Sequence, residues 1–494
     1  MKGIQRKMKR LFISVLCLFL LLVTVVSCAE KPTTGEETLP TGTKEPETER
    51  ITSDLPDLKW DGETFMMLHW FVDGWEIHGT DLYAEELNSD PINDEVFNRN
   101  SRLSERYDVE FELDELNYNE MVSKIRTWIN SNEDVYDLIG VRIADAPRIM
   151  LEGSLLDFNY DLPYVNLDKP YWDQSVREML SFGDSLFLMT SDTTISDKNA
   201  TAAVAFNKVL ASDLNLPNFY DLVKNGEWTM DKMIDVMEGY NADLNGDGVI
   251  DPEDDIAAFL GADDVVMAFF MGGGGHFTVR DEYNFPELDF NTEENFDILD
   301  TVFDIMYHER FINFWELRGV IPHGQGYYFL GSHGVFQWLR MEDVIKMRGQ
   351  EGDDFGIIPT PKYTEDQPEY LSLLSKHGST SQGVLRCETD VDFVSFMLEA
   401  MAAESHYDLQ NAYYDVTLKT KSTRDDESQD MLDIIFAHRV IDIAEVGEFG
   451  GFPDYLLRFC SNHHGRDIAS AYASYETKIQ QAIDDFTEKI ENLM

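Results

Sequence analysis

The sequence is poor in cysteine. It has four cysteines among 494 residues, and two of them, Cys17 and Cys28, stand near the start of the chain. The other two, Cys387 and Cys460, lie far apart and match no zinc-ligand spacing. A disulfide-stapled scaffold is therefore excluded. Outside a cell, Cys387 and Cys460 could form one disulfide or remain two buried thiols, and the sequence leaves both possibilities open.

Motifs that mark common enzyme classes are also lacking. The chain contains no G-x-S-x-G, no H-E-x-x-H and no G-x-x-x-x-G-K. The glycine run 272–275 does not have the spacing of a dinucleotide-binding loop. A pair of glycosidase carboxylates is defined by distance in space, so it cannot be read from the sequence. We therefore expect a protein that is not an enzyme, with a hydrolase of surface glycans as the main alternative.

Positive charge is scarce. The chain has 39 Lys and Arg against 93 Asp and Glu, a formal net charge of −54. A field of this sign repels phosphate backbones, so we expect no nucleic-acid partner. Hydrophobic residues make up 43% of the chain, enough for a large core. The length after residue 58 exceeds what one simple core accommodates, which predicts two lobes.

The N-terminus predicts export. Basic residues precede an apolar run, 11–26, that is short for a membrane span. The end of this run, Val-Val-Ser-Cys, resembles a bacterial lipobox, in which Cys28 is lipidated after removal of signal peptide 1–27. Residues 28–58 are rich in Pro, Thr, Gly and Glu, which predicts a disordered tether. We expect a protein anchored by lipid to the outer face of the cytoplasmic membrane; an uncleaved anchor or plain secretion are the alternatives.

Strand and helix patterns alternate along the rest of the chain. Strands are expected at 64–71, 109–113 and 135–141, separated by helices near 91–107 and 121–128. This alternation is typical of a mostly parallel sheet covered by helices. The later predicted elements are strands at 185–190, 201–206, 334–338 and 355–359, a helix after Thr229, a helix at 293–311, and a C-terminal helix with Ile479, Ile483, Phe486 and Ile490 on one face.

The stretch DLNGDGVIDPED, 243–254, has the spacing of a calcium loop with a glycine at the sharp turn. The expected ligands are Asp243, Asn245, Asp247, the Val249 carbonyl, Asp251 and Asp254. Asp254 replaces the usual glutamate at position twelve, so magnesium remains possible and so does a plain acidic turn. Sensor loops usually come in pairs, and no second loop follows. We therefore expect a structural calcium ion.

Several stretches together resemble the sugar-type extracellular solute-binding proteins of bacterial ABC importers, in their lipoprotein branch. Besides the lipobox and tether they are DSLFLMTSDTTISDKNATAAVAFN (184–207) followed by Lys208, GEWTMD (226–231), FGIIPTPK (355–362) and YYDVTLKTKSTRDDESQDMLDIIF (413–436). They occur in the family's order along nearly the whole mature chain. The family also often carries a D-x-N-G-D-G loop at this position.

The resemblance implies an α/β, two-lobed periplasmic-binding-protein-like fold (type II). Each lobe would hold a mostly parallel sheet flanked by helices, and a hinge would join the lobes. Lobe 1 would combine 59–185 with 328–375, and lobe 2 would combine 186–327 with 376–494. The protein would be a monomer that captures a carbohydrate in the cleft and delivers it to ABC permease subunits; a surface adhesin is a further alternative.

In such folds, ligands lie at the carboxyl ends of strands, where sugars need aromatic platforms and polar partners. The residues that fit are Trp70, Asp73, Trp75, Arg142, Asp192, His276, Trp338 and Tyr455. Each has a simpler explanation: a tryptophan at a strand end can be core, the aspartates can cap turns, and Arg142 can belong to an ordinary ion pair. The sequence does not decide between these roles.

Overall fold

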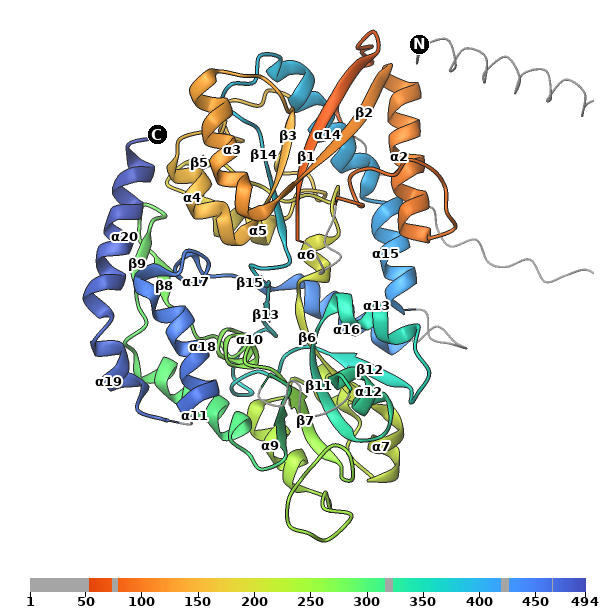
Figure 1. The fold of residues 1–494 in the computed structure, drawn as a ribbon, viewed down its shortest axis with the longest axis vertical. Coiled ribbons are helices and arrows are strands. Elements are labelled where there is room, and N and C mark those ends of the chain that lie inside the picture. The colour runs from red at the N-terminus through yellow and green to blue at the C-terminus, as the bar shows by residue number, and fades with distance from the viewer. Residues whose placement is uncertain (1–52, 73–78, 316–322, 419–425, 464) are drawn as a thin grey trace, which may run out of the picture. The chain divides into compact units, whose positions relative to one another are not determined.

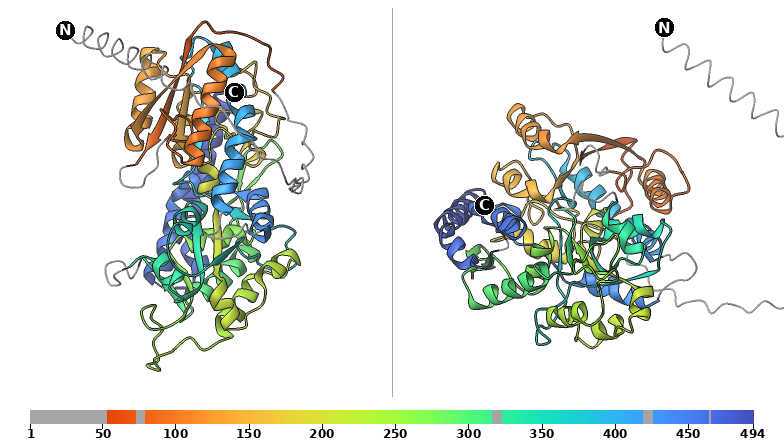
Figure 2. Two further views of the ribbon diagram at one scale, coloured as in Figure 1. Left: turned by 90° about the vertical axis from the view of Figure 1, so that its right-hand side faces the viewer. Right: turned by 60° about the horizontal axis from the view of Figure 1, so that its bottom comes forward.

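The computed structural model describes residues 53–72, 79–315, 323–418, 426–463 and 465–494, which belong to one compact unit (Figure 1). The predicted signal peptide, the lipidation site Cys28 and nearly all of the tether lie outside the described residues, as do the ligand candidates Asp73 and Trp75. Two separate sheets form the centres of two lobes. The α/β, two-lobed architecture expected from the sequence is confirmed, and Figure 2 shows the lobes after a 90° turn.

The first lobe is built on a four-stranded sheet in the order β14-β3-β1-β2. The central strand β1 pairs in parallel with β2 and β3, while β14 runs antiparallel to β3. Most of β1 is buried, as expected for a strand covered on both faces. The strands are β1 (Glu63–Phe71), β2 (Val109–Asn117), β3 (Leu138–Arg142) and β14 (Thr380–Gly383). The helices of this lobe are α2 (Pro91–Tyr107), α3 (Tyr118–Ser131), α4 (Ala146–Leu151), α5 (Gln174–Leu180) and α14 (Val391–Ser405), with a hairpin of β4 (Ser181–Phe182) and β5 (Ser185–Leu186).

The second lobe is built on a five-stranded sheet in the order β10-β7-β11-β6-β12. Here β7, β10, β11 and β12 share one direction and β6 runs against them. The strands are β6 (Ala202–Asn207), β7 (Ala257–Gly261), β10 (Phe311–Asn313), β11 (Gly334–Arg340) and β12 (Phe355–Ile358). The covering elements are α7 (Lys208–Asp213), α8 (Phe219–Lys224), α9 (Met230–Glu238), α10 (Val265–Gly272), α11 (Glu293–Met306), α12 (Gln325–Leu330), α13 (Met341–Arg348), α16 (Asp426–Ala437) and the hairpin β8 (Thr278–Arg280) with β9 (Pro286–Leu288).

Two of the segments that connect the lobes, which we call the crossing segments, lie side by side. The first runs from β5 through α6 (Ser196–Asn199) into β6, and the second from β13 (Ser372–Leu373) to β14. They meet at an antiparallel bridge between Thr201 and Leu374. The Ser375 amide also donates to the Ala200 carbonyl at 3.0 Å. The two connections are therefore hydrogen bonded to each other.

The C-terminal region contacts both lobes. Helix α15 (Asp408–Leu418) packs against α2 of the first lobe and α13 of the second, and α20 (Glu476–Glu491) packs against α4 and β9. The predicted face of α20 is buried, because Ile479, Ile483, Phe486 and Ile490 recur at helical spacing. The other elements here are β15 (Arg439–Val440), α17 (Ile443–Val446), α18 (Phe452–His463) and α19 (Ile468–Ala473).

The predicted division of the chain between the lobes needs correction. Residues 328–375 were assigned to lobe 1, yet β11 and β12 lie in this stretch and pair with β6 and β7 of the second lobe. Conversely, β14 falls within 376–494, assigned to lobe 2, and pairs with β3 of the first. The chain therefore returns to the first lobe after β13, about fifty residues later than the sequence suggested, because alternation predicts a strand but not the sheet that it joins.

Two predicted elements are shorter than expected. The strand expected at 185–190 is a two-residue strand, β5, followed by an isolated bridge at Met189. The helix expected at 293–311 ends at Met306, and Phe311, the last residue of the expected range, begins β10. Cys387 and Cys460 are both free and buried, which decides the question that the sequence left open. Within the described part of the chain, no helix is both long and apolar enough to span a bilayer.

Candidate ligand cavity at the crossing segments

The topology turns the carboxyl edges of both sheets toward the crossing segments. In the second lobe, β6 enters from the first lobe at Ala202, opposite Arg340 at the end of β11. In the first lobe, β14 enters at Thr380, opposite Arg142 at the end of β3. Loops at the carboxyl ends of parallel strands are the usual place for ligands in open α/β sheets. The region around 374–380 is therefore where a ligand site is expected.

A cavity of about 130 Å³ lies in this region, and we call it the crossing cavity. It is formed by the loop between β7 and α10, the second crossing segment, α17 and the start of α18. Its lining residues are Asp264, Met267, Leu373, Ser375, Lys376, His377, Glu445, Glu448, Pro453, Asp454 and Leu457. The volume is below the roughly 300–1,000 Å³ of typical ligand pockets. In this conformation, the cavity has room for one group of a ligand and not for a whole oligosaccharide.

Lys376 is the cation of this cavity, and its ammonium group is already paired. Its Nζ lies 2.9 Å from Oε1 of Glu445, donates to the Glu445 carbonyl at 2.8 Å and forms an ion pair with Glu448. Burial disfavours the charged amine, but Glu445 and Glu448 raise the pKa of Lys376 overall. The lysine stays charged at neutral pH and holds α17 against the crossing segment.

His377 and Asp264 also have shifted pKa values. Part of His377 is exposed, but burial of its imidazole among neighbouring groups, together with the positive charges of Lys376, Arg142 and Arg340, lowers its pKa to about 4. Its imidazole is therefore neutral at pH 7. Burial raises the pKa of Asp264, although Arg340 opposes the shift. The cavity thus offers carboxylates and a neutral imidazole to a ligand.

Comparison with solved structures gives the fold a precedent. The sugar-binding protein MalE from Xanthomonas citri superimposes with a TM-score of 0.55 at 11% identity, covering 87% of this chain and 98% of that one. A sugar transporter from Rhizobium etli in an open conformation gives 0.55 at 10% identity, with 87% and 99% covered. An ABC substrate-binding protein from Listeria monocytogenes in complex with cycloalternan gives 0.52 at 10% identity, with 87% and 99% covered.

The chain has the fold of a two-lobed solute-binding protein. The coverage shows that this likeness extends over almost all of each compared chain, so both lobes are included. No protein-family model and no curated protein matches the sequence. At such low identities the likeness establishes the fold alone.

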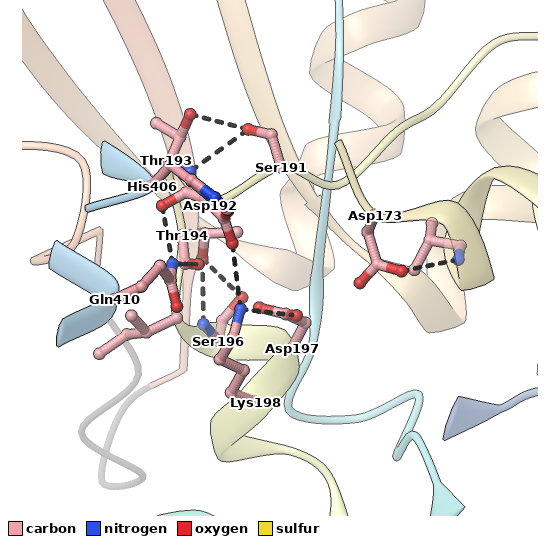
Figure 3. Close-up of polar contacts among 12 residues, drawn as sticks. Asp173, Ser191, Asp192, Thr193, Thr194, Ser196, Asp197, Lys198, His406 and Gln410 are labelled. Atoms are coloured by element: carbon pink, nitrogen blue, oxygen red, sulfur yellow. Dashed lines mark hydrogen bonds and ion pairs between the residues drawn. The ribbon is translucent and has the colours of Figure 1, made fainter. Parts of the chain in front are cut away.

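Asp192, one of the predicted ligand residues, belongs to a charged cluster on the first crossing segment (Figure 3). Its carboxylate accepts from His406 and lies 3.3 Å from the Lys198 ammonium. Lys198 in turn approaches Asp197, which also pairs with Arg439. The same arginine pairs with Asp173, the N-cap of α5 in the first lobe, so that the cluster ties the crossing segment to that lobe. Asp192 is thus held by protein partners.

Two predicted tryptophans are core residues, which is the alternative that the sequence left open. Trp70 is 0% exposed, and its indole donates to Oγ1 of Thr380 at 2.9 Å. Trp338 on β11 is 8% exposed, and its indole Nε1 is buried without a hydrogen-bond partner. Neither ring offers a face to a sugar in this conformation.

The remaining predicted residues do not line the crossing cavity, although Arg142 is close enough to affect the pKa of His377. Arg142 pairs with Asp145 at 2.9 Å, which is the ordinary ion pair considered above. His276 pairs with Asp289 at 3.0 Å, and Tyr455 packs on Tyr475 with ring centroids 4.9 Å apart. None of the six predicted residues that fall within the described chain lines the cavity. Their role in ligand binding remains a prediction.

No motif marks the cavity residues in the sequence, because Asp264, Lys376 and Glu445 are far apart along the chain. One aromatic residue could have been noticed. Trp315 lies two residues after the end of β10 and is 50% exposed. Asn313, at the end of β10, donates to Asp263 at 2.7 Å, so the end of β10 lies beside the end of β7 that opens into the cavity. Trp315 therefore stands at the same edge of the sheet.

The predicted calcium loop lies between α9 and β7, and three carboxylates converge in it. Oxygens of Asp243, Asp247 and Asp255 all lie within 4.8 Å of one another. Gly248 has a φ of +83°, in the left-handed region that glycine favours, as the loop pattern requires. Asp255 holds the loop through the amides of Leu244 and Asp251, whereas Asp254 is exposed and outside this group. These oxygen donors fit a hard cation such as calcium.

Proposed function

We propose that this chain is the capture component of an ABC importer, which binds a carbohydrate at the crossing segments and delivers it to membrane permease subunits. The observation that carries the proposal is the topology: two α/β lobes present their carboxyl edges to paired connections, and a polar cavity lies beside them. One compared protein is in complex with cycloalternan, and the other two are described as a sugar transporter and a sugar-binding protein, which supports a sugar as the cargo. The chain performs no chemistry on it, and hinge motion between the lobes encloses it.

Isothermal calorimetry against a panel of oligosaccharides, with a reducing-end assay on the same samples, tests this function. We expect one-to-one binding of an intact oligosaccharide and no new reducing ends. New reducing ends would instead establish the hydrolase alternative. If no glycan in the panel binds and a surface protein does, the adhesin alternative is correct.

The N-terminal features support a lipid-anchored location on the outer face of the cytoplasmic membrane. Cys28 would carry the lipid, and the Pro- and Thr-rich residues after it would serve as the tether. Cell fractionation of wild type and Cys28→Ser separates the alternatives. We expect the wild type in the membrane fraction and the variant mainly outside it. A variant that stays in the membrane would indicate an uncleaved anchor.

A calcium ion bound by the loop would stabilise the second lobe without taking part in ligand binding. At millimolar calcium and a dissociation constant near 10⁻⁴ M, the ion would add roughly 1.4 kcal/mol to the free energy of unfolding. We expect chelation to lower the melting temperature accordingly and to leave the ligand affinity of the folded protein nearly unchanged. Differential scanning calorimetry with and without calcium measures the first effect, and isothermal calorimetry measures the second.

Two variants at neighbouring positions test which carboxylate at the end of the loop binds calcium. The structure predicts that Asp255→Asn removes the calcium-dependent shift in melting temperature, while the sequence spacing assigns this effect to Asp254→Asn. Comparing each variant with and without calcium cancels any direct effect on stability. A wild type whose melting temperature is the same with calcium and with chelator would contradict the proposed site.

A further inference from the structure

The crossing cavity is negatively charged. Its lining contains four carboxyl groups, and Lys376 is the one lysine or arginine among the lining residues. Burial raises the pKa of Asp264 and of Glu445, and a bound cation would lower both values again by favouring the ionised form. His377 adds no charge at neutral pH, because its pKa is about 4. A net negative, partly buried site favours a cationic group over an anionic one, and also over a neutral one.

The hydrogen-bonding capacity left in the cavity is almost entirely that of acceptors. An ammonium group has three donors, and those of Lys376 are directed at the Glu445 carbonyl, Glu445 Oε1 and Glu448. Glu445 is only 6% exposed, and its second oxygen, Oε2, is buried without a hydrogen-bond partner. Asp264 makes no cap bond to α10 and no ion pair within the described part of the chain. A carboxylate can only accept, so a ligand group must supply the donors.

A metal ion does not account for these carboxylates. Among the described residues, three or more possible metal ligands come close enough together to hold an ion at one place, formed by Asp243, Asp247 and Asp255. The carboxylates of the crossing cavity do not converge in this way. An organic cation, whose several N–H donors point in different directions, suits separated acceptors better than a single ion does.

We infer that the crossing cavity binds a protonated amine of the captured carbohydrate, with Asp264 and Glu445 as its acceptors. The cargo would therefore be an amino sugar or an oligosaccharide that carries one. The cavity of about 130 Å³ has room for about four waters, which suits an amine and its neighbouring atoms. The rest of the ligand would lie along the carboxyl edges of the sheets. This inference rests on the proposed capture function and specifies its cargo.

Three disaccharides with one linkage test the inference by isothermal calorimetry: the β-1,4 disaccharide of glucosamine, its N-acetylated counterpart, and cellobiose. We expect the amine to bind at least about tenfold more tightly than the other two at pH 6, since hydrogen bonds to charged groups are stronger than those between neutral groups. Its advantage should shrink as the pH rises and the amine loses its proton. N-acetylation also removes the positive charge, so the N-acetylated disaccharide should lose the same affinity advantage.

The Asp264→Asn variant supplies the site-specific test. It should reduce the affinity for the glucosamine disaccharide by about tenfold and change that for cellobiose little. Asp235→Asn is the matched control, because it removes the same charge from an exposed position on α9 and should change neither affinity. Equal affinities for cellobiose and the amine would overturn this inference and leave the capture function standing. If none of the three disaccharides binds, the inference fails, while the broader glycan panel decides the capture function separately.

Discussion

Replacing Arg439 with methionine is expected to lower the free energy of unfolding by about 3–5 kcal/mol, because it leaves buried carboxylates without their cation. The guanidinium is buried and pairs with Asp173 of the first lobe and Asp197 of the crossing segment. Both carboxylates are themselves almost inaccessible to solvent. Methionine fills a similar volume but offers no charge and no N–H donor. Urea denaturation of the wild type and the variant measures the difference.

The pH dependence of the same variant provides a second readout. Burial alone would raise the pKa of Asp197, but Lys198 and Arg439 lower it below its ordinary 3.8. A depressed carboxyl pKa stabilises the fold above the ordinary value, and this stabilisation is lost as the pH falls through the folded-state value. The acid-induced loss of stability should therefore be smaller in Arg439→Met than in the wild type.

Arg466→Met is the matched control for this experiment. Arg466 is half exposed and pairs with Asp304, which is also exposed. Exposed pairs contribute about 0–1 kcal/mol, so this variant should unfold almost like the wild type. A loss below about 1 kcal/mol for Arg439→Met would mean that the buried cluster does not stabilise the connection between the lobes.

Lys376→Met is expected to destabilise the protein by a similar amount, about 3–5 kcal/mol at pH 8. Lys376 is the cation that neutralises Glu445, which is buried, and Glu448. Burial already raises the pKa of Glu445, with Lys376 opposing the shift. Removing the lysine should raise this pKa further. Since a raised carboxyl pKa costs stability as the pH increases, the variant should lose less stability at pH 5 than at pH 8.

Thermal denaturation at both pH values measures this effect, with Lys232→Met as the control. Lys232 is partly exposed on α9, 3.7 Å from Asp235, and its replacement should cost at most about 1 kcal/mol at either pH. A loss of stability in Lys376→Met that is equal at pH 5 and pH 8 would contradict the assigned role of Glu445. A stable variant would show that α17 is held to the crossing segment by other contacts.

Local patterns predicted the elements of the fold well, because burial periodicity is written into neighbouring residues. The α20 face and six of the nine strands described in the two main sheets follow directly from it, whereas β7, β10 and β14 were not predicted. The allocation of strands to lobes was not predictable in this way. Strands β11 and β12 were expected in lobe 1, but both pair with β6 of the second lobe. This choice depends on long-range pairing that no local window contains.

The candidate site was predicted less well, and for the same reason. The predicted strand-end residues Arg142 and Trp338 lie near the carboxyl edges of the two sheets. The cavity itself is formed by a loop, a crossing segment and a C-terminal helix from distant parts of the chain. Glu445 and Lys376 are ordinary charged residues in the sequence, and only the fold makes them partners. The calcium loop was easier to find, because its residues are consecutive.

The bridge between Thr201 and Leu374 has a consequence for insertions and deletions. This isolated bridge and the hydrogen bond from the Ser375 amide to the Ala200 carbonyl hold the two crossing segments together at one point, just before β6 begins. One residue added to a single crossing segment would displace one sheet relative to the other and misalign the two carboxyl edges. A residue added to an exposed surface loop would leave that alignment unchanged. Length variation among relatives of this chain should therefore be found in surface loops and be absent from the paired connections.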